Sequence, residues 1–158
     1  MESLLPSQKH FLMSEPRIES PERCVIVIDN ELPVGRAANA AAVLALTVGA
    51  RHPMLVGPPL VDADGVAHPG LIPIGIAVLA GPASQLSEIR ARALESGCDV
   101  VDFPVQGQRT TNYSSFVDDV SQVKTDDLAY VGVALVGAKK PISKIVANLS
   151  LLKPSAAA

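Results

Sequence analysis

The chain contains no tryptophan and few other aromatic residues, since Phe and Tyr together make up only 3% of its 158 residues. Its apolar content of 48% must therefore come from aliphatic side chains and alanine, which predicts an aliphatic core. Charged residues make up 18%, and the mean hydropathy is +0.31. This charge content is low for a well-solvated monomer, so we expect a homodimer that buries apolar surface.

Long hydrophobic runs are also missing. The longest, near residues 40–50 and 71–80, fall short of the ~20 residues that a membrane helix needs. No basic segment followed by an apolar one opens the chain as a signal peptide would, so we expect a cytoplasmic protein without a membrane span. The net charge of −3 and the lack of a Lys/Arg cluster weigh against nucleic acid as a partner.

Familiar catalytic motifs are absent as well. The sequence has no Gly-x-Ser-x-Gly, no His-Glu-x-x-His and neither glycine pattern of a phosphate loop, so it indicates no catalytic residue and no cofactor. Its two cysteines, Cys24 and Cys98, each precede a predicted strand and would be neighbours if those strands pair. We interpret them as reduced, partly buried thiols of a cytosolic protein.

The most informative stretch is 23–50. Four consecutive β-branched residues, 25–28, predict a strand covered on both faces. Asn30, Pro33 and Gly35 then indicate a loop, with Gly35 permitting a turn, and an Ala-rich helix follows from Arg36 to Val48. The loop Asn30–Arg36 would therefore join the end of a strand to a helix N-terminus, where free N–H groups attract an anion.

The remaining pattern predicts one α/β domain over 23–153, preceded by a flexible N-terminal arm, 1–22, and followed by a tail, 154–158. We expect three layers, α/β/α, around a mixed four-stranded sheet, with one pair antiparallel because no strong helix connects the last two strands. The predicted elements are a loop-rich insertion at 51–69, strands at 72–80, 99–105 and 130–136, a helix between Ser84 and Gly97, a long polar segment at 106–127, and a helix from Pro141 to Leu152.

The stretch 23–50 resembles the opening of a type II peptidyl-tRNA hydrolase, and the resemblance extends over roughly 23–152. It is carried by an acidic-Leu pair, a Gly-basic pair, an Ala-rich helix and the final YVGVALVGAKKPISKIVANLSLL segment; the matching residues are Glu31, Leu32, Val34, Gly35, Arg36, Ala40 and Ala41. The resemblance implies that enzyme's fold. However, alanines 38, 42 and 45 stand where the hydrolases have a Lys, a Gln and a His, and alanine transfers no proton.

Beyond the first helix, Gln106 stands near the hydrolase Asp, whereas Arg109 and Thr110 match the hydrolase pattern. The chain is more similar to an uncharacterised, mostly bacterial family with the same fold, domain of unknown function 2000. The phrases VDADGVAHPGLIPIGIAVLA, DVVDFP and YVGVALVGAKKPISK carry this second resemblance. Together the two resemblances imply a hydrolase-like fold that lacks the hydrolase's catalytic residues.

Three polar segments stand out in this aliphatic sequence. Asp62, Asp64 and His68 have the composition of a metal site, but Asp-Ala-Asp-Gly is also an ordinary turn, and we interpret it as a turn without metal. We expect a cleft bordered by the loop Asn30–Arg36, the turn Asp62–His68 and the segment Arg109–Tyr113. The predicted ligand-binding residues are Asn30, Gly35, Arg36, Asp62, His68, Arg109 and Tyr113.

The leading hypothesis is a binding module for a small polar or anionic ligand, or for a protein. One alternative is an enzyme of unknown reaction that uses Arg36, Asp62, His68, Arg109 and Tyr113. Another is a residual peptidyl-tRNA hydrolase that cleaves the ester of peptidyl-tRNA, which would need a basic face and side-chain donors at positions 38, 42 and 45.

Overall fold

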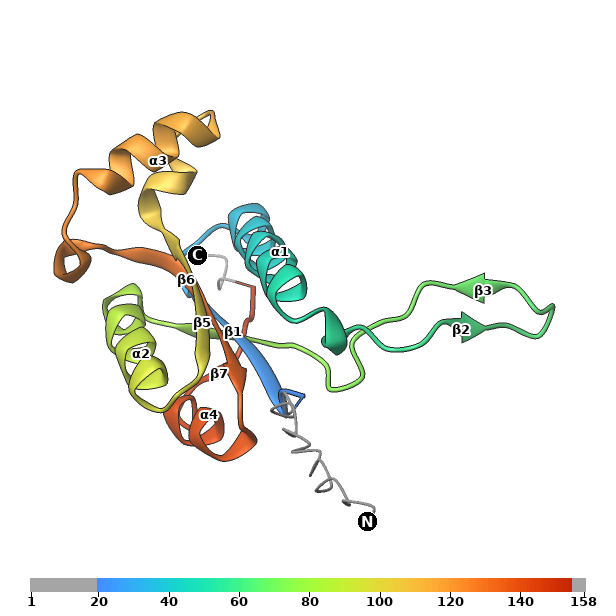
Figure 1. Cartoon of the computed structure of the whole chain (residues 1–158). Helices are drawn as coiled ribbons and strands as arrows, with labels where there is room; N and C mark the ends of the chain where they lie inside the picture. Colours follow the sequence, from blue (N-terminus) through green and yellow to red (C-terminus); the bar gives the residue numbers. More distant parts are fainter. Residues whose placement is uncertain (1–19, 155–158) are drawn as a thin grey trace, which may run out of the picture.

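The computed structural model describes residues 20–154, so the predicted N-terminal arm and tail lie almost wholly outside the described residues. A mixed five-stranded sheet with the order β5-β6-β1-β4-β7 forms the centre (Figure 1). Its strands are β1 (Arg23–Asp29), β4 (Ala77–Gly81), β5 (Asp99–Pro104), β6 (Tyr130–Gly137) and β7 (Ser150–Leu151). β1 and β4 run parallel, whereas β6 is antiparallel to β1 and to β5.

Helices cover the sheet on both faces, as expected for a three-layer α/β protein. α1 (Val34–Arg51) packs on one face, where Ile26 and Ile28 meet the buried residues Ala40 and Leu44. α2 (Ala83–Glu95) and α4 (Lys139–Ile145) pack on the other (Figure 1). The residues of β1 alternate between these two clusters, which explains why its sequence is apolar at every position from Cys24 to Ile28.

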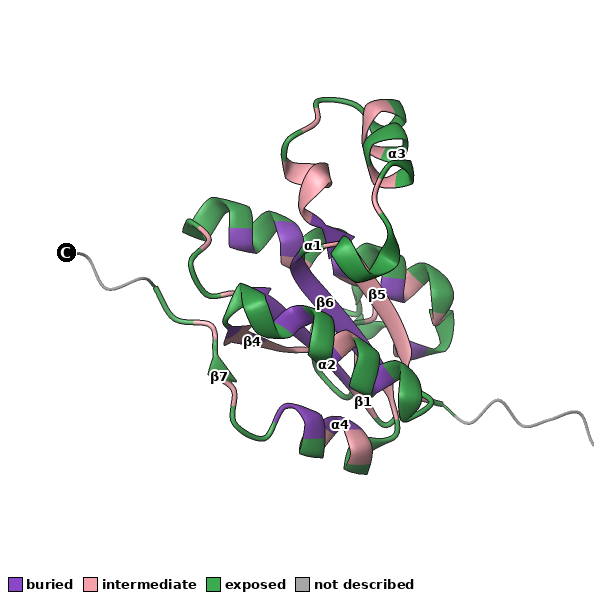
Figure 2. Ribbon diagram, turned by 90° about the vertical axis from the view of Figure 1, so that its left-hand side faces the viewer, coloured by how far each residue is buried: buried purple, intermediate pink, exposed green. Residues whose placement is uncertain are grey.

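Two parts lie outside this sandwich. A short helix, α3 (Tyr113–Ser121), follows the turn η2 (Val105–Gln108) and has no buried residue (Figure 2). The chain also leaves α1 through the turn η1 (Pro53–Leu55) and forms a hairpin from β2 (Leu60–Val61) and β3 (Ala67–His68), which projects away from the sheet (Figure 1). The β2–β3 hairpin, defined here as residues 56–74, returns directly into β4.

The mixed sheet between helical layers and the antiparallel pairing of β5 with β6 are confirmed. The predicted number of strands is wrong, since the sheet has five strands and not four. The last helix ends at Ile145 and does not reach Leu152. Ser150 pairs instead with Ala80 of β4. Without β7 the edge of β4 would leave backbone N–H and C=O groups unpaired, and satisfying them outweighs the helical spacing of the apolar residues.

Two further boundaries differ. The predicted strand 72–80 begins only at Ala77, because Pro73 lacks an N–H and Gly75 takes a positive φ of 70°. α1 begins at Val34, so Gly35 lies inside its first turn with an ordinary φ and is not the predicted turn residue. Among residues 20–154, no helix is both long and apolar enough to span a membrane.

Candidate functional site

The loop that joins β1 to α1 lies where the parallel strands β1 and β4 end. It is fixed by backbone bonds, since Asn30 N–H donates to Gly81 O over 3.0 Å and Leu32 N–H to Asp29 O over 3.3 Å. Pro33 caps α1 but provides no side-chain acceptor for the first N–H groups of the helix. The N–H groups of the first turn therefore face outward with the positive end of the helix dipole.

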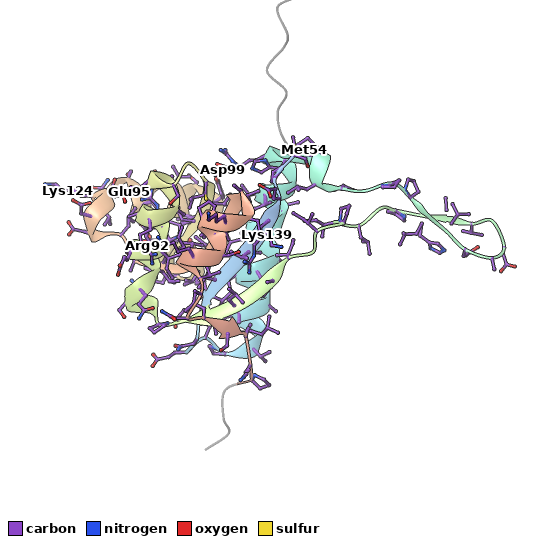
Figure 3. All side chains as sticks on the ribbon, turned by 90° about the horizontal axis from the view of Figure 1, so that it is seen from below. Met54, Arg92, Glu95, Asp99, Lys124 and Lys139 are labelled. Atoms are coloured by element: carbon purple, nitrogen blue, oxygen red, sulfur yellow. The ribbon has the colours of Figure 1, made fainter. Side chains whose placement is uncertain are left out.

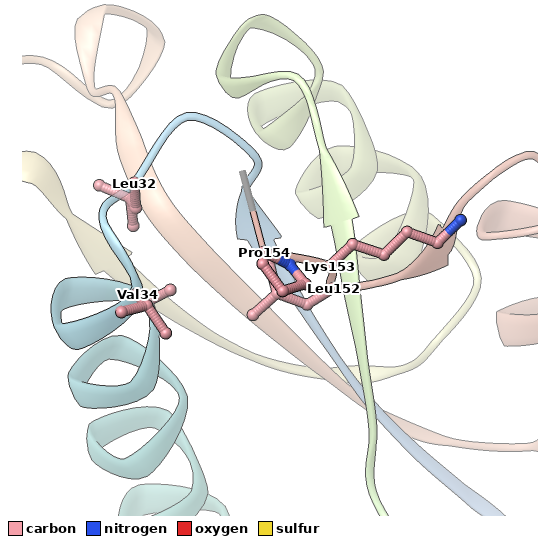
Figure 4. Close-up of a pocket in the computed structure, with 6 residues that line it drawn as sticks. Leu32, Val34, Leu152, Lys153 and Pro154 are labelled. Atoms are coloured by element: carbon pink, nitrogen blue, oxygen red, sulfur yellow. The ribbon is translucent and has the colours of Figure 1, made fainter. Parts of the chain in front are cut away.

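A cavity of about 190 Å³ opens beside this helix start (Figure 4). Leu32, Val34 and Ala37 form one wall. The opposite wall is the chain after β7, which Leu152 ties to β4 by donating its N–H to Val78 O over 2.9 Å. The full lining is Leu32, Val34, Ala37, Leu152, Lys153 and Pro154. The ammonium group of Lys153 points away from Val34, so the walls are apolar (Figure 4).

The predicted residues of the first loop are neighbours in sequence of the residues that line this cavity, but they do not line it themselves. Asn30, Gly35 and Arg36 are exposed, and an added Cβ on Gly35 would meet no atom within 4 Å. Leu32 and Val34 line the cavity instead. Sequence reasoning passed over these two residues because it searched for polar groups, although an apolar pair just before a helix could have signalled a pocket wall.

Arg109 and Tyr113 lie in a separate place, at the end of β5. There η2 and α3 enclose a hollow of about 180 Å³ lined by Gly107, Phe116 and the segment 110–113. Asn112 caps α3, its Oδ1 accepting from Ser115 N–H over 2.8 Å, and the Tyr113 side chain is 78% exposed. The rings of Tyr113 and Phe116 meet edge to face at 6.0 Å. This hollow shares no lining residue with the cavity at α1.

Asp62 and His68 lie on the β2–β3 hairpin, away from the sheet (Figure 1). Asp62 Oδ1 accepts from the N–H groups of Asp64 and Val66, both over 3.0 Å, and His68 Nε2 lies 2.9 Å from Asp62 Oδ2. These bonds, that to His68 first, lower the pKa of Asp62. The turn interpretation fits this arrangement. The hairpin lies away from the other two segments, so a single chain does not bring all three together.

The structure also contains two ion-pair groups that sequence reasoning missed. Arg51 binds the Asp99 carboxylate with two nitrogens, each at 2.8 Å, and His52 Nε2 lies 2.6 Å from Asp99 Oδ2. Arg90 binds Asp102 over 2.6 Å and lies 5.7 Å from the centre of the Tyr130 ring. The paired residues are 47 or 48 positions apart in the first group and 12 in the second, so no local sequence pattern indicated these ion pairs.

Both groups brace helices against β5. The Asp99 carboxylate joins the C-terminal end of α1 to β5, and its pKa is lowered, first by the Arg51 hydrogen bond. Asp102 does the same for α2 through Arg90. We interpret both groups as structural, because each ties a helix to β5.

The two cysteines are buried in different parts of the core. Cys24 packs with the α1 cluster and Cys98 with the α2 and α4 cluster, and β6 lies between their strands. The expectation that they would be neighbours depended on pairing of β1 with β5, which does not occur. Burial raises the pKa of the Cys24 thiol to about 11 and raises that of Cys98 too. Burial therefore favours the neutral thiol at both positions.

These features define a small α/β protein with a cavity at the carboxyl ends of two parallel strands. The chain belongs to the family described as proteins of unknown function, DUF2000, whose sequence model matches residues 22–153. Among curated proteins, none matches the chain significantly.

A solved structure of similar fold is Atu0240 of Agrobacterium tumefaciens strain C58, a protein of unknown function. It superposes with a TM-score of 0.74 at 23% sequence identity, over 82% of this chain and 96% of that one. At this identity the likeness shows the fold alone. The architecture is thus shared with a protein described as being of unknown function.

Proposed function

We propose that the protein is a binding module for a small molecule with an apolar body and one carboxylate group. The observation that carries this proposal is the cavity between Val34 and Leu152, placed against the first turn of α1. Open α/β sheets bind ligands in the crevice outside the carboxyl ends of their strands. The end of the parallel pair β1 and β4 is such a position.

The lining determines the chemistry of the ligand. The apolar walls of Leu32, Val34 and Ala37 favour a hydrocarbon group, and the free N–H groups at the start of α1 favour an anion. Arg36, the third residue of α1, is exposed in the same turn. The volume of about 190 Å³ lies below the ~300–1,000 Å³ of drug-sized sites, so the ligand is small.

The fold is, in this proposal, of the peptidyl-tRNA hydrolase II type without its chemistry. Ala38 and Ala42 are exposed and Ala45 is half-buried, and none carries a group that transfers protons or donates a hydrogen bond. Purified protein should therefore not cleave peptidyl-tRNA above the rate without enzyme. Turnover that disappears in Arg36→Ala would instead support the residual hydrolase. A cytoplasmic location belongs to the same proposal.

Thermal shift with linear monocarboxylates of increasing length tests the ligand class. A carboxylate of matching size should raise the unfolding midpoint, because it binds only the folded state, and the amide of the same length should raise it less. Val34→Trp should abolish the shift by filling the entrance, since Val34 is 79% exposed and tolerates the change.

The matched control is Val117→Trp on α3, an exposed valine away from this cavity, which should keep the shift. Equal shifts with acids and amides would contradict the anion subsite. A shift that survives Val34→Trp would place the ligand elsewhere.

A further inference from the structure

The β2–β3 hairpin exposes an unusual number of apolar side chains. Val61 is 67% and Leu71 70% exposed. The hairpin as a whole extends away from the body (Figure 3). The exposed apolar residues of this segment are Val56, Leu60, Val61, Val66, Leu71 and Ile74. Exposed apolar side chains gathered on one segment favour association with a partner.

The hairpin is nevertheless held in one shape. Gly57 N–H donates to Leu71 O over 2.8 Å, and Asp62 N–H donates to Val66 O over 3.0 Å. Near the base of the hairpin, outside β2 and β3, the two arms approach each other so closely that a Cβ added to Gly70 would lie 1.9 Å from Gly57 O. The paired strands are only two residues long, too short to be stable alone in water. A preorganised ribbon with exposed apolar side chains is suited to pack on a partner.

The outward face of α1 provides the complementary surface within the same chain. Leu46 is 77% exposed, Val43 is 42% exposed, and the exposed Ala38 and Ala42 leave room for a close approach. The charges match as well. α1 carries no carboxylate and its Arg36 is exposed, whereas the hairpin carries two aspartates and no Lys or Arg. Arg51, at the C-terminal end of α1, is already bound to Asp99.

The position of the hairpin excludes its own helix as the partner and suits a second copy. It leaves from the C-terminal end of α1 and points away from that helix (Figure 1). Its arms span about 30 Å at ~3.3 Å per residue. The 18 residues of α1 span about 27 Å. Under a two-fold axis, the hairpin of each protomer would run along its partner's α1 with the acidic tip toward the positive N-terminal end.

We propose that the chain forms a two-fold symmetric dimer in which each β2–β3 hairpin packs on the outward face of the partner's α1. Two-fold symmetry gives two such contacts, so the hairpin and the outward face of α1 are covered in both protomers. A standard interface uses about 20–30 residues from each partner. The hairpin and one helix face supply a set of about that size. This association does not depend on the proposed small-molecule ligand.

Sedimentation equilibrium of the full chain tests the proposal. The wild type should be a dimer, and Leu46→Asp or Val61→Asp should raise its dissociation constant at least about tenfold by burying an unpaired charge. Leu46 and Val61 are both exposed in the single protomer, so each variant should still fold. Circular dichroism checks that the fold is retained. Val117→Asp on α3, 51% exposed, is the matched control and should leave the dimer intact.

A cross-linking experiment tests which surfaces meet. Leu46→Cys and Val61→Cys chains, purified separately and mixed, should be joined between residues 46 and 61 by a short bifunctional thiol reagent, whereas Val117→Cys mixed with Val61→Cys should not. The native cysteines are buried and should stay unreacted. A monomeric wild type at the highest soluble concentration would overturn the proposal. So would a dimer that keeps its affinity in both Asp variants or shows no 46–61 link.

Discussion

The body of the molecule and the β2–β3 hairpin use the same kinds of apolar residue in opposite ways. In the body, Val25, Val27 and Leu135 are fully buried between sheet and helices (Figure 2). In the hairpin, Leu60, Val61 and Leu71 are all more than half exposed. The body completes its core with its own chain, whereas the outer part of the hairpin is held by backbone bonds and by the hydrogen bonds of the Asp62 turn. The difference teaches that local order and burial are separate properties.

The junction between these regions explains how the hairpin is positioned. Leu55, in η1, is buried, and Ile72 and Ile76 pack against the α1 cluster on the return path. Both ends of the hairpin are therefore anchored in the body. The direction of the hairpin is set by the packing at its two ends and by the flanking prolines, which restrict the backbone.

The largest expected effect separates body from hairpin. Leu135→Ala should lower the free energy of unfolding by about 2–5 kcal/mol, because it leaves a cavity in the centre of the sheet. Leu71→Ala should change it by less than about 0.5 kcal/mol in the monomer, since the side chain is 70% exposed. Urea unfolding at a concentration where the chain is monomeric measures both. Similar losses in the two variants would mean that the hairpin packs on its own body.

The next effect distinguishes the two faces of α1. Ala40→Leu should cost about 1–3 kcal/mol by overpacking, because Ala40 is fully buried against the sheet. Ala41→Leu should cost less, since Ala41 is only half-buried, and Ala42→Leu on the outward face should cost almost nothing in the monomer. Thermal unfolding of the three variants gives the order. An equal cost at positions 40 and 42 would contradict the orientation of the helix.

The general architecture was predictable because each part of the body has a clear local signal. The all-apolar run 25–28 predicted a strand covered on both faces, and the Ala-rich run after it predicted a closely packed helix. The last helix was misjudged because Leu149 and Leu152 keep helical spacing. The chain is extended at Ser150–Leu151 because it pairs with the edge of β4. The sequence pattern does not show that this edge lies nearby.

The candidate site was predicted in part. The position at the end of β1 follows from strand and helix order, but its walls, Leu32 and Leu152, come from opposite ends of the chain. The Asp62–His68 turn was recognised locally, yet nothing in its sequence indicates that it projects from the body. The direction in which a hairpin projects depends on the packing at its two ends. That packing involves residues far apart in the chain, so a single sequence does not show it.

A smaller effect is expected where α1 is tied to β5. Asp99→Asn should lower the free energy of unfolding at neutral pH by about 1 kcal/mol, because the partly exposed carboxylate accepts hydrogen bonds from Arg51 and lies against His52. The pKa of Asp99 is lowered in the folded state. Its contribution is therefore complete above the usual value of about 3.9 and is lost as the pH falls through the folded pKa.

Chemical denaturation of both proteins from pH 7 down to pH 3 checks this sign. The gap between wild type and Asp99→Asn should narrow as the solution becomes acidic. Glu95→Gln on α2, which removes an exposed carboxylate, controls for general charge effects. A gap that widens in acid would mean that Asp99 is not held as a carboxylate.

The smallest effect concerns the second carboxylate that lies against a histidine, Asp62 beside His68. Unlike Asp99, it joins no two elements of the body, so Asp62→Ala should leave global unfolding within about 0.5 kcal/mol of the wild type. The turn should nevertheless open, because Asp62 Oδ1 accepts the N–H groups of Asp64 and Val66. Amide hydrogen exchange at those two residues should become faster while exchange in β1 and β6 stays unchanged. If exchange in β1 and β6 also became faster and the midpoint of unfolding fell, the hairpin would be part of the cooperative core, and its separation from the body would be wrong.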